Sequence, residues 1–270
     1  MSGPDDEMMR EAVRKRYGSI ARSEEPGCGC SSSSCCGGSP GPASELHWDG
    51  SARMGYSKEE LESAPEGANL GLGCGNPHAF ASLKRGETVL DLGSGGGFDC
   101  FIASHRVGPE GHVIGVDMTP DMITKARRNA KSGGFTKVEF RLGEIEHLPV
   151  ADGTIDVIIS NCVINLSTDK QSVFNEAFRV LRPGGRLAVS DVVATAELPE
   201  GIKNDLVLYS SCAGGAEPVR KLEMMLKKSG FEEVRIMPKD DSREFIREWA
   251  PGSRIEDFIV SATIEAMKPL

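Results

Sequence analysis

The chain has 270 residues, a net charge of −9 and eight cysteines. At roughly 100–200 residues per domain, this length predicts about two domains. There is no basic run and no apolar stretch of about 20 residues, so we expect neither a nucleic-acid partner nor a membrane span. The polar, acidic N-terminus is unlike a signal peptide, and we expect a cytoplasmic protein whose cysteines stay reduced.

The first 53 residues predict a helix followed by an arm. The apolar spacing of residues 7–22 is typical of a short helix. Residues 24–45 are rich in Gly, Ser and Pro, and such a segment buries too little apolar area to order itself. We therefore expect a flexible arm that carries Cys28, Cys30, Cys35 and Cys36. A loop-rich stretch (54–76) follows, and Asn76-Pro77 then opens a helix that runs through Leu83.

From Glu87 onward, strands and helices alternate. Strands are predicted at 88–92, 112–117, 137–142, 154–160 and 186–193, and helices at 98–107, 120–132, 170–181 and 219–229. Alternation of this kind predicts an α/β fold with a mostly parallel sheet and helices on both faces. The turn Arg182-Pro183-Gly184-Gly185 is expected to end a helix before the fifth strand. Two further strands are expected at 233–238 and 257–266. We assign 54–195 to a ligand-binding domain and 196–270 to a smaller region that covers the substrate.

A glycine-rich turn follows the first of these strands. Its sequence, from Asp91 to Gly97, has the form Asp-x-Gly-x-Gly-x-Gly, and the next strand ends in Asp117. Glycines let the backbone approach a ligand closely, and an acid at this place can accept hydrogen bonds from ribose hydroxyls. The third glycine comes too early for the dinucleotide fingerprint, and no Gly-Lys-Ser/Thr triphosphate motif is present. The pattern predicts a pocket for an adenosine-containing cofactor; the alternative is a turn that serves packing alone.

Three single cysteines lie in small-residue loops near the expected pocket. Cys74 precedes a helix, Cys162 follows the fourth strand, and Cys212 follows the fifth. Each taken alone reads best as a small buried hydrophobe, as Cys100 does, but three together favour binding of a soft, thiophilic ion. Structural zinc usually takes paired Cys-x2–4-Cys ligands, which these widely spaced residues do not offer.

The glycine turn resembles that of class I S-adenosylmethionine-dependent methyltransferases. More specifically, the sequence is similar to the arsenite S-adenosylmethionine methyltransferases in PEGANLGLGCGNP (65–77), VLDLGSGGGFDC (89–100), GEIEHLPV (143–150), SNCVINL (160–166) and CAGGA (212–216). The resemblance implies a Rossmann-like methyltransferase fold with S-adenosylmethionine as cofactor. The cofactor residues that it implies are Asp91, Gly93, Gly95 and Gly97 at the amino-acid part, Asp117 at the ribose, Glu144, Ile145 and Glu146 at the adenine, and also Met118 and Asn161.

The resemblance further implies that Cys74, Cys162 and Cys212 handle trivalent arsenic, both arsenite and methylarsenite. A fourth cysteine would come from the arm, where we favour the Cys35-Cys36 pair, and thioredoxin or glutathione would be the reductant. The arsenic lone pair carries no proton, so methyl transfer needs no general base, and the five histidines form no evident acid–base group. Two alternatives stay open: a small-molecule C- or O-methyltransferase, and a non-catalytic thiol protein that binds metalloids.

Overall fold

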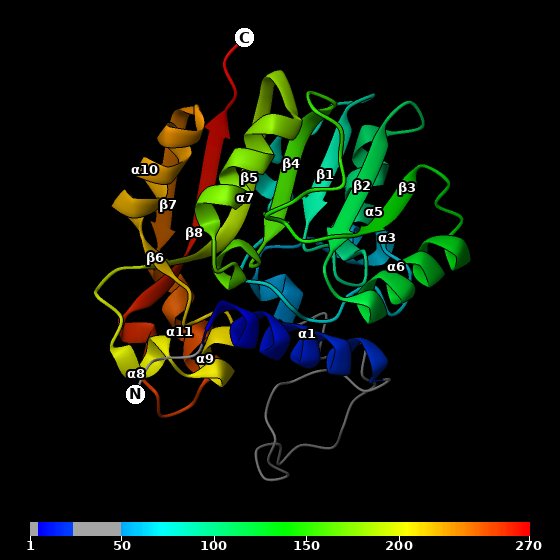
Figure 1. The fold of residues 1–270 in the computed structure, drawn as a ribbon. Helices are drawn as coiled ribbons and strands as arrows, with labels where there is room; N and C mark the ends of the chain where they lie inside the picture. Colours follow the sequence, from blue (N-terminus) through cyan, green and yellow to red (C-terminus); the bar gives the residue numbers. More distant parts are fainter. Residues whose placement is uncertain (1–4, 24–49) are drawn as a thin grey trace.

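The computed structural model describes residues 5–23 and 50–270, and its centre is one eight-stranded sheet (Figure 1). The strand order is β3-β2-β1-β4-β5-β8-β7, with β6 paired to β5. Strands β1 to β5 are parallel, whereas β8 runs antiparallel to both of its neighbours. The bounds are β1 (Thr88–Leu92), β2 (His112–Asp117), β3 (Val138–Leu142), β4 (Ile155–Asn161), β5 (Leu181–Ala194), β6 (Glu217–Pro218), β7 (Glu232–Lys239) and β8 (Ile259–Met267).

Helices cover both faces of this sheet. Successive residues of its buried strands point to opposite faces, and apolar side chains on both faces pack against the helices. In β1, Val89 packs in the core with α5 and α6, and Leu90 packs in the core with α7 and α10. The predicted α/β fold, with a mostly parallel sheet and helices on both faces, is therefore confirmed. The helices are α1 (Asp6–Arg22), α3 (Lys58–Ser63), α4 (His78–Ala81), α5 (Phe98–Val107), α6 (Pro120–Ser132), α7 (Lys170–Val180), α8 (Glu200–Lys203), α9 (Leu206–Ser210), α10 (Val219–Ser229) and α11 (Arg243–Ile246).

Helix α1 crosses the sheet at the carboxyl ends of the parallel strands (Figure 1). It packs against α6 on one side and α9 on the other. Arg22 pairs with Asp121 of α6, and Arg14 pairs with Glu144 in the loop after β3. The predicted N-terminal helix thus becomes part of the cover over the end of the sheet where α/β proteins bind ligands.

Two local expectations differ from the structure. The expected turn 182–185 lies inside β5 as a bulge: Ile155 pairs with Leu181 and Val157 with Arg186, so strand pairing resumes after Gly184, whose φ is 76°. The stretch 54–76, expected to be mostly loop, contains α3. A capping box between Ser57 and Glu60 starts that helix. Within the described ranges, no helix is both long and apolar enough to cross a membrane.

Strands from the C-terminal region complete the sheet. The domain boundary expected after residue 195 stays a prediction. Strand β5 ends at Ala194, and β8 pairs with it over nine residues from Arg186 to Ala194. Because β4 and β5 are parallel neighbours, the loops that follow them lie side by side at one edge of the sheet. This arrangement brings the loop with Cys162 next to the segment with Cys212.

Candidate functional site

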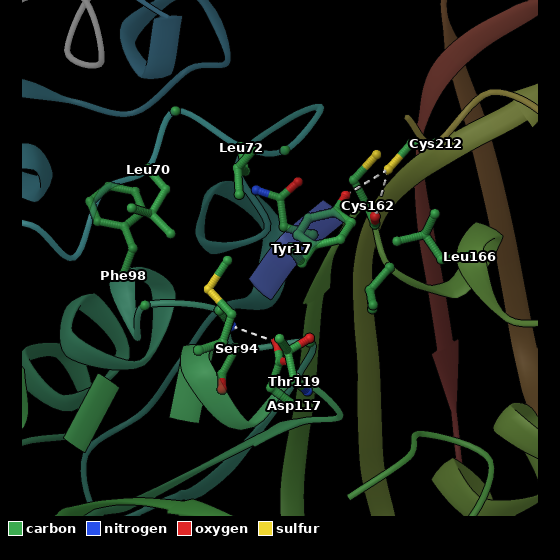
Figure 2. Close-up of a pocket in the computed structure, with 18 of the residues that line it drawn as sticks. Tyr17, Leu70, Leu72, Ser94, Phe98, Asp117, Thr119, Cys162, Leu166 and Cys212 are labelled. Atoms are coloured by element: carbon green, nitrogen blue, oxygen red, sulfur yellow. Dashed lines mark hydrogen bonds between the residues drawn. The ribbon is translucent and has the colours of Figure 1, made fainter. Parts of the chain in front are cut away.

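A cavity of about 520 Å³ opens at the carboxyl ends of the parallel strands, under α1. Its wall includes Ser94, Asp117, Cys162 and Cys212, together with Tyr17 of α1. Figure 2 shows the Tyr17 side chain reaching toward Cys212, with Ser94 and Asp117 on another side of the cavity. The volume lies in the range of small-molecule sites, roughly 300–1,000 Å³.

The glycine turn after β1 has a conformation that side chains would block. Gly93 has φ 71°, and a Cβ there would meet Val163 Cγ2 at 2.6 Å. Gly97, at φ 93°, would likewise meet Phe140 at 2.7 Å. At Gly95 a Cβ would find no atom within 4 Å, because that part of the turn faces open space. The turn therefore exposes its backbone to the cavity.

Asp117 fixes this turn. Its carboxylate accepts hydrogen bonds from the Gly95 N–H at 3.0 Å and from the Thr119 N–H at 2.8 Å. Burial raises the pKa of Asp117, and these two backbone bonds oppose the rise. Asp117, which is predicted to bind the ribose, therefore also holds the glycine turn in its observed conformation.

The other residues predicted at the cofactor divide into two groups. Met118, Ile145, Glu146 and Asn161 line the cavity, as do Gly93 and Gly95. The second group lies outside the lining: Asp91, Gly97 and Glu144. Asp91 is 2% exposed and accepts a hydrogen bond from the Cys100 thiol at 3.2 Å. Glu144 instead pairs with Arg14 of α1.

Unpartnered polar atoms in the wall fit a polar ligand. Among the described residues, the buried Ser94 Oγ and Asn69 Nδ2 have no hydrogen-bond partner, and both residues line the cavity. Buried donors and acceptors are costly to leave unpaired, so they mark where ligand atoms would bind. Together with the open turn at Gly95, they fit a cofactor with an amino-acid part and a ribose.

The three predicted cysteines lie together at one side of the cavity. Cys74, Cys162 and Cys212 are buried, and within the described part of the chain all are free thiols. The sulfurs of Cys74 and Cys162 and a carboxylate oxygen of Asp191 lie within 4.8 Å of one another. The Cys212 thiol donates to the Cys162 carbonyl at 3.2 Å. The loop after β4, the segment beyond β5 and the segment before α4 thus place three thiols from distant sequence positions around one space.

Cys162 and Cys212 both adopt left-handed backbone conformations, with φ 59° and 67°. Such conformations cost about 1–3 kcal/mol for a residue other than glycine and occur at sites where the surroundings enforce them. At Cys162 the loop is held by Asp191, which accepts from the N–H groups of Ile164 at 2.9 Å and Asn165 at 3.2 Å. The strain is consistent with selection of these thiol positions for function.

The thiols have different acidities. Hydrogen bonding with the Cys162 thiol, and further with Tyr17 and Asn165, lowers the pKa of Cys212 although burial opposes it. The Tyr17 hydroxyl lies 3.5 Å from the Cys212 sulfur. The pKa of Cys162 is raised well above its usual value by its bonds with the other two thiols and by burial. Cys212 is therefore the thiol of this pair that ionises first.

Comparison with known proteins identifies the family. A methyltransferase-domain model matches residues 83–238. The chain is 53% identical to the arsenite methyltransferase of Halobacterium salinarum, over 98% of this chain and 68% of that protein. The chain belongs to the arsenite methyltransferase family. It is an S-adenosylmethionine-dependent methyltransferase.

Other members of the arsenite methyltransferase family are longer than the matched region. Identity is 39% with the protein of Aquipseudomonas alcaligenes, over 85% of this chain and 64% of that one. It is also 39% with the Mus musculus protein, over 68% of this chain, and the match spans about half (51%) of that relative. The crystal structure of an arsenic(III) S-adenosylmethionine methyltransferase from Chlamydomonas reinhardtii matches with a TM-score of 0.61 at 31% identity, covering 86% of this chain and 75% of that one.

Two residues at the site of this arsenite methyltransferase family member, Tyr17 and Asp191, belong to no recognisable sequence motif. In the sequence, Tyr17 is one apolar position of the predicted helix 7–22, and Asp191 follows Ser190 in the predicted strand 186–193. An acid inside a predicted central strand is the one signal that points to such a residue. Cys100 is fully buried, as predicted, and its thiol bonds to Asp91. The predicted Cys35-Cys36 pair lies outside the described residues.

Proposed function

We propose that this chain transfers methyl groups from S-adenosylmethionine to trivalent arsenic, converting arsenite to mono- and dimethylated arsenicals. Cys162 and Cys212 are the core arsenic ligands, and Cys74 is the third ligand. The observation that carries the proposal is the group of three buried thiols in and beside the wall of a cavity whose glycine turn fits the cofactor. We place the reaction in the cytoplasm, where thiols are kept reduced.

The cofactor supplies an electrophilic methyl group when bound. On this chain the glycine turn, Asp117, Met118 and the 145–146 segment would hold it, with Ser94 as an additional hydrogen-bonding group. Asp91 and Glu144 lie outside the cavity lining and support it indirectly. Asp91 bonds to Cys100 of α5, and Glu144 pairs with Arg14 of α1. These residues position the cofactor and exclude water, and no proton transfer is required of them.

Arsenite binds by exchange of hydroxyl groups for thiols. Each arsenic–sulfur bond forms as one hydroxyl leaves, and the thiol proton departs with it as water. Of the two thiols Cys162 and Cys212, Cys212 begins this exchange, because it forms its thiolate more readily. Soft thiolates suit trivalent arsenic better than the oxygen ligands nearby. Three such exchanges occupy all three thiols.

Methyl transfer then requires positioning rather than a base. Bound S-adenosylmethionine would supply its methyl group to the arsenic lone pair without loss of a proton, so the residues of the chain have only to align the two groups. Asp191, the carboxylate nearest the thiols, is already engaged: besides the two loop N–H groups it accepts from Asn165 Nδ2 at 2.6 Å and from the Val192 N–H at 2.8 Å. We therefore assign Asp191 to holding the loop in place.

Transfer formally oxidises arsenic to the pentavalent state. Two of the three arsenic–sulfur bonds then break as their sulfurs join in a disulfide, which returns two electrons to arsenic. Water supplies a hydroxyl group to one vacated position and releases a proton, and the product again contains trivalent arsenic. Exchange with the Cys35-Cys36 pair, and then with thioredoxin or glutathione, regenerates the dithiol through mixed disulfides. This relay completes the proposed cycle and makes a thiol reductant the chain's partner.

The test is an assay with the purified full chain, S-adenosylmethionine with a labelled methyl group, arsenite and a thiol reductant, followed by chromatography of the arsenic species. We expect labelled methylarsenicals. Arsenite binding without any labelled product would instead identify a thiol protein that only binds metalloids. No binding of arsenite, with methylation of an organic acceptor, would identify a C- or O-methyltransferase.

A further inference from the structure

Side chains from three strands contact Cys74, two of them at its backbone and one at its sulfur. Asn161, at the end of β4, accepts from the Cys74 N–H through Oδ1 at 3.0 Å and donates through Nδ2 to the Gly75 carbonyl at 2.7 Å. On the other side, the Ser261 hydroxyl of β8 donates to the Cys74 carbonyl at 2.7 Å. Ser190 of β5 lies 3.9 Å from the Cys74 sulfur. The place of this thiol is therefore fixed through its backbone.

The glycines on either side of Cys74 make these contacts possible. A Cβ at Gly73, which has φ 126°, would lie 2.7–2.9 Å from the amide atoms of Asn161. A Cβ at Gly75 would lie 2.2 Å from Ser190 Oγ. Both distances are too short for real atoms, so only glycine lets the segment lie against Asn161 and Ser190. The Gly-Cys-Gly sequence thus reports a close fit of this loop to the sheet.

Tyr56 helps to hold the Asn161 amide in the direction that the Cys74 N–H and the Gly75 carbonyl require. Its hydroxyl accepts from Asn161 Nδ2 at 2.9 Å and donates to Asp99 Oδ1 at 2.7 Å. His78 Nε2 lies 3.2 Å from the same Asp99 oxygen. Burial and the nearby Asp99 raise the pKa of Tyr56 well above its usual value, so the hydroxyl keeps its proton and its direction. The amide nitrogen must then face Tyr56, which leaves the amide oxygen for Cys74.

We infer that Tyr56 is a positioning residue that, through Asn161, holds Cys74 where arsenite needs its third thiol. The inference rests on the proposed function. Arsenite has three hydroxyl groups to exchange, whereas methylarsenite has two and is satisfied by Cys162 and Cys212. Precise placement of Cys74 therefore matters for the first methylation and little for the second. Tyr56 is 5% exposed and lies outside the lining of the cavity.

The first test is the substrate dependence of Tyr56→Phe at saturating S-adenosylmethionine. We expect kcat/KM for arsenite to fall about tenfold, since Asn161 Nδ2 loses the Tyr56 hydroxyl as an acceptor and the Asp99 carboxyl loses it as a donor, and kcat/KM for methylarsenite to change less than twofold. Any change at the cofactor through Asp99 affects both substrates equally and cancels in their ratio. Tyr209→Phe is the matched control, because Tyr209 is another buried tyrosine whose hydroxyl donates to the Leu166 carbonyl. Equal loss for both substrates in Tyr56→Phe would overturn the inference.

The second test needs no arsenic. The full chain, reduced and freed of reductant, is alkylated with iodoacetamide, and modification is followed by mass spectrometry of the peptide that contains Cys74. We expect Cys74 to react at least threefold faster in Tyr56→Phe than in the parent chain or in Tyr209→Phe, with circular dichroism unchanged. An unchanged rate would refute the positioning role. A faster rate in a chain that methylates no arsenic would support the positioning role and refute the proposed function instead.

Discussion

Removal of the Tyr17 hydroxyl should change the acidity of Cys212. Tyr17→Phe keeps the ring that packs between α1 and the thiol loops, and removes only the group 3.5 Å from the Cys212 sulfur. A hydrogen bond to a charged group contributes about 1.5–3 kcal/mol. Because about 1.4 kcal/mol corresponds to one pKa unit, we expect the pKa of the Cys212 thiol to rise by about one unit.

The assay is the rate of Cys212 alkylation by iodoacetamide as a function of pH, read on the peptide that contains Cys212. Below the midpoint the thiolate fraction falls tenfold, but a more basic thiolate is about threefold more nucleophilic, so the rate should fall only about threefold. Above the midpoint the variant should react faster than the parent chain. Tyr209→Phe should leave the midpoint unchanged. A Tyr17→Phe profile that scales down at every pH, with its midpoint in place, would show a packing role and refute this reasoning.

Three further predictions concern the proposed cofactor and thiol residues. Asp117→Ala should weaken S-adenosylmethionine binding at least tenfold in calorimetric titration, because it removes the expected ribose acceptor and the bond to Gly95; an unchanged affinity would contradict the site. Cys162→Ser or Cys212→Ser should abolish methylation of both arsenite and methylarsenite in a folded chain. The Cys100→Ser variant should stay active, because a serine hydroxyl can still donate to the Asp91 carboxyl. Chromatography of the arsenic species decides between these outcomes. Replacing all four cysteines of segment 24–45 by Ser leaves α1 intact and should permit cofactor binding. It should stop multiple turnovers on arsenite in an assay with a thioredoxin system. Progress curves equal to those of the parent chain would exclude a redox role for that segment.

The local sequence determined most of the secondary structure. Strands β1 and β2 have the predicted bounds, as do α5, α6 and α10. These elements were predictable because short apolar runs between glycines and prolines set strand and helix ends locally. The glycine turn also identified the cofactor pocket, since its spacing is a property of consecutive residues. Helix α3 was missed even though its capping box, Ser57 to Glu60, is present in the sequence.

The relations between segments were decided by the tertiary structure. The sequence named Cys74, Cys162 and Cys212, but only the order of β4, β5 and β8 in the sheet places their loops around one space. The Tyr17 hydroxyl lies against Cys212, 195 positions away along the chain, and the Tyr56 hydroxyl accepts from Asn161, 105 positions away. Hydrogen bonds of this kind depend on packing between elements, which leaves no periodic signal in the sequence. The sequence therefore identified the three candidate sulfurs, and the fold determined which side chains lie against them.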